Sequence, residues 1–186
     1  MIDKSRSDAW SLLCEYTHSE SLRKHALAVE AAMCWYASKY GADPELWGNT
    51  GLLHDFDYEK WPDQEDHPMR GMAILREKGW PEEMICAIGG HAQYLGIPRE
   101  TQLAKALFAV DELCGFLTAC AYVKPSRRIA DVEVASVRKK LKDKAFARSV
   151  SREDIVQGAE ELNVPLDEHI ANCIEALRGA SDTLGL

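Results

Sequence analysis

The sequence has no long apolar run, no excess of positive charge and no clustered cysteines, and each absence excludes a class of protein. No window reaches the roughly 18–20 uncharged apolar residues that a membrane-spanning helix needs. With 22 basic and 30 acidic residues the net charge is −8, so the chain has no overall attraction for DNA, RNA or anionic lipid. We therefore expect neither a DNA partner nor a membrane partner.

Six cysteines are scattered along the chain without a CxxC pair, which indicates reduced thiols rather than a disulfide framework. The first thirteen residues, MIDKSRSDAWSLL, lack the apolar core and the small-residue cleavage site of a secretory signal. Together these observations predict a cytoplasmic location. The length of 186 residues, 46% of them hydrophobic and 28% charged, fits one globular domain, or one domain with a helical extension.

Apolar residues recur at steps of three and four, which is the period of an amphipathic helix. The spacing, together with cap residues, predicts helices over residues 21–40, 44–53, 68–78, 101–123, 131–147 and 151–163, and further helices that begin at Pro81 and Pro165. Residues 56–68 are polar, hold two prolines and show no period, so we expect a loop there. No alternating β-branched stretch reaches five residues, and the predicted fold class is all-α.

Several metal-binding residue types occur within the apolar helices. His25 lies beside the apolar stripe of its helix, and Asp111 lies in the most apolar helix of the chain, where an unpaired carboxylate is costly. His54 and Asp55 close another apolar helix. Imidazole and carboxylate groups together suit divalent transition metals such as Mn, Fe, Zn, Co and Ni. The alternatives are a core histidine bonded to a carbonyl group and a structural ion-pair partner.

An upstream helical His25, the pair His54-Asp55 after Gly-Leu-Leu, and the later Asp111 resemble the H…HD…D signature of the HD-domain superfamily of metal-dependent phosphohydrolases. The segments GLLHDFDYE, DHPMRG, AIGGHA and LFAVDELCGFLTACAYVKPSR resemble small bacterial members. This resemblance covers roughly residues 21–128 and implies a compact multi-helix bundle. We predict an HD-domain core over residues 1–128 and a C-terminal helical extension over residues 129–186, packed on the same domain.

The resemblance implies metal ligands at four positions: His25, His54, Asp55 and Asp111. Members with a second metal add two histidines between the HD pair and the last aspartate, and this sequence has His67 and His91 in that interval. The site is therefore expected to hold one or two divalent ions, with two favoured and Asp55 as the bridge. The alternatives are that His67 caps the helix begun by Pro68 and that His91 ends a helix after two glycines.

The resemblance implies hydrolysis of a small phosphate ester by a metal-activated water. The expected substrate is a phosphomonoester or phosphodiester, with a nucleotide favoured. The nucleotidase branch of the superfamily carries a glutamate three residues after the HD aspartate, where this sequence has Tyr58. We therefore expect the catalytic roles to fall on Asp55 and on the flanking acids Asp57 and Glu59.

Lys124 and Arg127, in the basic turn after the Asp111 helix, are predicted to bind the substrate phosphate, with a solvated helix end as the alternative. His18 and His169 lie in polar surroundings and are predicted to be surface residues. Two other functions stay open. The metal could act on a non-phosphate substrate, or the chain could be a non-catalytic signalling or ligand-sensing module with a structural or relic metal site. The sequence does not indicate an oligomeric state.

Overall fold

The computed structural model describes residues 4–186, and this part of the chain is helical without a β-strand. Residues 1–3, the start of the segment inspected for a secretory signal, lie outside the described residues. The α-helices are α1 (Arg6–Tyr16), α2 (Glu20–Tyr40), α3 (Pro44–Leu53), α4 (Met69–Glu77), α5 (Glu82–His91), α6 (Gln102–Tyr122), α7 (Val134–Leu141), α8 (Arg152–Glu161), α9 (Leu166–Gly179) and α10 (Ser181–Leu184). Two short 3-10 helices, η1 (Gln93–Leu95) and η2 (Ile129–Asp131), flank α6. The predicted all-α class is confirmed.

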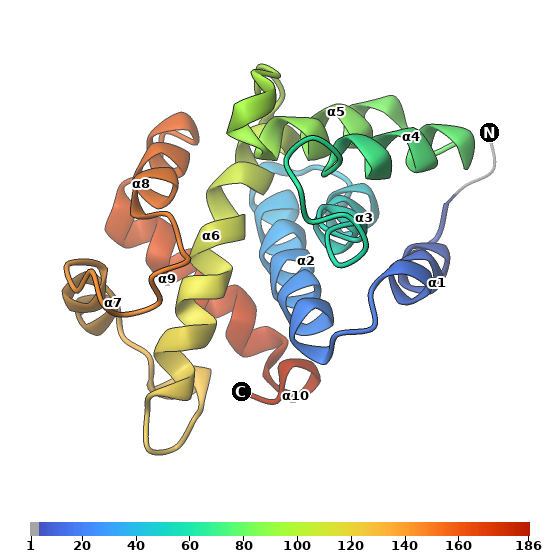
Figure 1. Cartoon of the computed structure of the whole chain (residues 1–186). Helices are drawn as coiled ribbons and strands as arrows, with labels where there is room; N and C mark the ends of the chain where they lie inside the picture. The colour runs from blue at the N-terminus through green and yellow to red at the C-terminus, as the bar shows by residue number, and fades with distance from the viewer. Residues whose placement is uncertain (1–3) are drawn as a thin grey trace.

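Helix α6 passes through the middle of the molecule beside α2 (Figure 1). Helix α3 packs along α2, with α1 against α3 and α4 against α5 on the same side. Helices α7 and α8 lie on the other side of α6, and α9 crosses behind α6 to contact α2. One hydrophobic core includes buried residues from both sides. Within the described residues, no helix is long and apolar enough to cross a lipid bilayer.

The close approach of α3 to α2 depends on Gly51. A Cβ atom there would lie 3.0 Å from the backbone nitrogen of Glu30 and 3.0 Å from the carbonyl carbon of Val29, so any side chain would push the helices apart. The N-terminus of α3 is fixed by Asp43, whose side chain accepts a hydrogen bond from the backbone N–H of Glu45. This packing brings the C-terminal end of α3 against the middle of α2.

The C-terminal helices share the same core. A Cβ atom on Gly158 of α8 would lie 2.5 Å from the Cα atom of Ala109 in α6. His169 of α9 is fully buried: its Nε2 donates to the Ala109 carbonyl at 2.9 Å, and its Nδ1 accepts from the Tyr36 hydroxyl at 2.6 Å. The surface prediction for His169 is therefore wrong, because the buried face of α9 includes it. His18 is exposed, as predicted.

The short helices η1, η2 and α10 were not predicted from the sequence, and two longer elements also differ from the prediction. Helix α1 was not predicted, although Ser5 and Asp8 form a capping box at its N-terminus. Helix α7 is shorter than the predicted range 131–147, because the chain turns back after Leu141. Phe146 then packs edge-on against Phe116 at 5.4 Å between ring centroids, and the Arg152 guanidinium donates to the carbonyl groups of that turn.

Candidate metal centre

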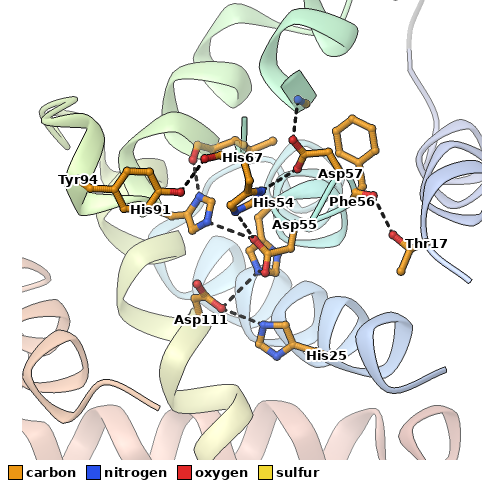
Figure 2. Close-up of polar contacts among 12 residues, drawn as sticks. Thr17, His25, His54, Asp55, Phe56, Asp57, His67, His91, Tyr94 and Asp111 are labelled. Atoms are coloured by element: carbon orange, nitrogen blue, oxygen red, sulfur yellow. Dashed lines mark hydrogen bonds and ion pairs between the residues drawn. The ribbon is translucent and has the colours of Figure 1, made fainter. Parts of the chain in front are cut away.

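The six predicted ligands come from five segments and converge at one place (Figure 2). Five of them form two groups: His25, His54 and Asp55 form the first, and Asp55, His67 and His91 form the second. Within each group the ligand atoms lie within 4.8 Å of one another. Helix α2 carries His25, the end of α3 carries His54, and the last residue of α5 is His91. Asp55 belongs to both groups.

Asp111 of α6 joins the first group. Its Oδ1 lies 2.9 Å from Nε2 of His25 and 3.3 Å from Nε2 of His54. Nε2 of His54 also lies 3.4 Å from Oδ2 of Asp55. Two imidazoles and two carboxylates therefore surround one point.

The second group uses the other carboxylate oxygen of Asp55. Nε2 of His67 and Nε2 of His91 each lie 3.2 Å from Oδ1 of Asp55. Asp55 thus presents Oδ2 to the first group and Oδ1 to the second, so its carboxylate could serve both groups if each held a cation.

Backbone carbonyls fix which nitrogen of two imidazoles carries the hydrogen. Nδ1 of His54 lies 2.8 Å from the Gly51 carbonyl oxygen, and Nδ1 of His91 contacts the Ile88 carbonyl oxygen. A carbonyl only accepts, so in the neutral rings Nδ1 donates and Nε2 directs its lone pair into the cluster. Nε2 of His54 and Oδ1 of Asp55 are buried without a hydrogen-bond partner. Converging lone pairs without a donor between them fit a bound divalent cation.

The carboxylates give the cluster a strong negative potential. Burial raises the pKa of Asp55, but the His54 imidazole more than offsets this and holds the pKa well below its usual range. Burial likewise lowers the pKa of His54, but the charges of Asp55 and Asp111 outweigh burial and raise it well above its usual value. Without metal, the cluster therefore attracts protons to the atoms where a cation would bind, and metal and protons compete.

Asp57 is not placed for the predicted catalytic role. It is fully buried and does not line the pocket. Its Oδ1 accepts from Nδ1 of His67 at 2.9 Å, and its Oδ2 accepts from the backbone N–H of Gly71 at 2.7 Å. A Cβ atom on Gly71 would lie 2.8 Å from the Asp57 carboxyl carbon, so glycine is needed for this contact. Asp57 orients His67 toward Asp55, which corrects the sequence-based assignment.

Glu59 is also removed from the catalytic set. It is exposed, and its Oε2 accepts from the backbone N–H groups of His18 and Ser19 at 2.6 and 2.9 Å. These residues directly precede α2, where the Ser19 side chain accepts from the backbone N–H of Leu22. The free N–H groups at the start of a helix favour a nearby negative charge. Glu59 therefore stabilises the entry to α2 rather than facing the pocket.

Lys124 and Arg127 lie far from the metal centre. Helix α6 continues from Asp111 to Tyr122, roughly 16 Å along its axis at 1.5 Å per residue, and the basic turn follows beyond that end (Figure 1). Neither residue lines the pocket over the metal centre. The prediction that this pair binds substrate at the metal centre is therefore wrong.

A pocket of about 360 Å³ opens over the cluster. Besides Asp55, His67, His91 and Asp111, its lining residues are Tyr58, Pro62, Gln64, Ala92, Gln93, Tyr94, Phe108, Glu112 and Asp154. Glu112 was missed by the sequence analysis, although its position directly after Asp111 is a signal that could have found it. Burial, and then the charge of Asp111, raise the pKa of Glu112 to about 7.

The comparisons with known proteins show the family of this chain. The family model for the HD domain matches residues 22–114, half of the chain, so the chain belongs to the HD domain family. A similar protein is Ribonuclease Y from Desulfotalea psychrophila, 27% identical over 173 residues, which cover 86% of this chain and 32% of that protein. The chain thus spans about a third of the length of this relative. No solved structure matches.

Proposed function

We propose that this chain is a metal-dependent hydrolase of small phosphate esters that uses two divalent transition-metal ions. HD-domain proteins are typically metal-dependent phosphohydrolases. The single observation that carries the proposal for this chain is the position of Asp55, whose two oxygens serve two ligand groups.

In this proposal His25, His54, Asp55 and Asp111 hold one ion, and Asp55, His67 and His91 hold the other. The ions would polarise a phosphoryl oxygen and lower the pKa of a bound water, the chemistry that a hydrolase of phosphate esters needs. The chain holds its ligands in place through the Gly51 and Ile88 carbonyls and the Asp57 carboxylate.

The pocket residues suggest how substrate is held and where a proton goes. Tyr58, Gln64 and Gln93 supply neutral polar groups on the rim, and Tyr94 donates to the His67 carbonyl at 2.6 Å. In this proposal Glu112, which lines the pocket directly after Asp111, gives a proton to the leaving oxygen. Glu112→Gln should lower kcat while the metal content stays unchanged, and equal turnover would exclude Glu112 from proton transfer.

The relative named as a ribonuclease supports phosphodiesters as one substrate class, since a ribonuclease cleaves the phosphodiester bonds of RNA. The decisive test is turnover of a phosphomonoester and a phosphodiester, p-nitrophenyl phosphate and bis(p-nitrophenyl) phosphate, followed by a panel of nucleotides, with Mn²⁺, Fe²⁺, Co²⁺, Ni²⁺ and Zn²⁺. We expect metal-dependent hydrolysis that Asp55→Asn abolishes. Protein that binds two ions but hydrolyses none of these esters would favour the non-catalytic module.

A further inference from the structure

The basic residues of this acidic chain are concentrated in one segment, residues 124–148. This segment, which we call the basic segment, holds nine basic and three acidic residues, a net charge of +6. The rest of the chain holds 13 basic and 27 acidic residues, a net charge of −14. The basic segment includes the turn after α6, then η2, α7 and the turn that follows.

Its basic side chains also differ from the others in their partners. Outside the basic segment, seven of the 13 basic residues form an ion pair: Arg6, Lys24, Lys39, Arg70, Arg76, Lys78 and Arg99. Inside the basic segment, one of the nine basic residues forms an ion pair with a partner within residues 4–186: Arg138, with Asp167. Uncompensated positive charge on an acidic protein is a local attraction for anions.

Three of these lysines surround one hollow, distinct from the metal centre. The hollow measures about 390 Å³, lies between the end of α6 and α7, and is lined by Cys120, Val123, Lys124, Ser136, Lys139, Lys140 and Asp143. Burial raises the pKa of the Cys120 thiol to about 11, and the positive charges of Lys140, Lys124 and Arg152 oppose this rise. Lys124 follows α6 and Lys140 belongs to α7, so lysines from two elements line the hollow.

Three lysines and one aspartate, Asp143, line the hollow, so its lining carries a net positive charge. Asp143 accepts the backbone N–H of Ala145 at 3.0 Å, and the Ser136 hydroxyl donates to the Glu133 carbonyl at 2.7 Å. Cys120 and the exposed Val123 add an apolar floor. The hollow thus combines three ammonium groups with an apolar surface.

We propose that this hollow is a second binding site, separate from the metal centre, for a small molecule that carries two or more phosphate charges and an apolar ring, the chemistry of a nucleoside diphosphate or triphosphate. The phosphates contact Lys124, Lys139 and Lys140, and the ring packs on Cys120 and Val123. Three cations at one point favour multiply charged anions over a single carboxylate.

The test is calorimetric titration of the full chain with ADP in excess EDTA, which removes metal from the other site. We expect saturable binding that Lys140→Gln and Lys124→Gln each weaken by about tenfold, as the loss of one charge-assisted contact predicts. The matched control is Lys144→Gln, which makes the same charge change at an exposed position of the basic segment outside the hollow, and it should keep wild-type affinity. Circular dichroism checks that each variant is folded.

Two outcomes would overturn the proposal. One is no saturable binding of ADP by the wild-type chain, and the other is an equal loss in Lys140→Gln and Lys144→Gln, which indicates diffuse attraction rather than a site. A single-stranded RNA oligonucleotide that binds more tightly than ADP and depends equally on Lys144 would replace the small-molecule site with a nucleic-acid surface. Because EDTA is present and no turnover is measured, failure here leaves the proposed hydrolase function untouched.

Discussion

The carboxylate of Asp55 contacts ligands of both groups, whereas the imidazoles of His67 and His91 belong to the second group alone. Asp55→Asn should therefore remove both ions. His91→Ala and His67→Ala should each remove about one ion and leave the other, because in a two-metal site each of these histidines would bind only one ion. Elemental analysis of metal per chain measures this. Wild-type metal content in both histidine variants would mean a single-ion site.

Asp57 acts on the second ion through His67. Asp57→Asn should weaken that ion's affinity by about 10–100-fold, the usual effect of losing the partner that orients a ligating histidine, while the affinity of the first ion changes little. Glu59→Gln is the control, since it makes the same chemical change two residues later on a side chain that faces α2. Competition with a chromophoric chelator gives both affinities, and equal effects of the two variants would contradict the positioning role.

At this scale the sequence predicted which candidate ligands lie together but not the residues around them. His25, His54, Asp55 and Asp111 stand out as polar residues in apolar helices, and the structure brings them together. Whether they ligate a metal stays a prediction until metal is measured. The turn that holds Asp57 has no period, so nothing in the sequence indicates that its side chain points inward to His67. Lys124 is different: the rise per residue of α6 already places it far from Asp111.

At the scale of elements, the contact between α6 and α8 depends on Gly158. Gly158→Ala would place a Cβ atom 2.5 Å from the Cα atom of Ala109, so the helices must separate, at a cost of about 1–3 kcal/mol in the free energy of unfolding. Gly179→Ala is the matched control, because no heavy atom lies within 4 Å of the added Cβ atom. Urea unfolding followed by circular dichroism measures both. A stable Gly158→Ala variant would show that α8 can move without loss.

The helices most visible in the sequence are those with long apolar stripes, α2 and α6. Helix α1 escaped prediction because it buries few apolar side chains, Ala9, Leu12 and Leu13, and its signal is the Ser5–Asp8 cap. Helix α7 was predicted too long because the basic residues that follow it are compatible with a helix. In the structure, Phe146 instead packs against the distant Phe116. A contact between distant residues leaves no periodic signal in the chain.

At the scale of the whole molecule, α9 is tied to α2 and α6 by the buried hydrogen bonds of His169. We therefore expect metal-free chain in EDTA to unfold in urea as one cooperative unit. All five tryptophans lie within residues 10–80, so fluorescence reports on the N-terminal part, while far-ultraviolet circular dichroism reports on all helices. Coincident midpoints are expected, and an earlier dichroism transition would show that residues 129–186 unfold separately.

The two ligand groups also differ in how much chain they enclose. The ends of the second group, Asp55 and His91, are 36 positions apart in the sequence, whereas the first group joins His25 to Asp111, which are 86 positions apart. Loop closure therefore costs roughly 0.8 kcal/mol more for the first group. During synthesis on the ribosome, the second group is complete about one to four seconds before Asp111 is added, at about 5–20 residues per second. The nascent chain thus carries all three candidate ligands of the second group before α6, the central helix of the folded protein, has been made.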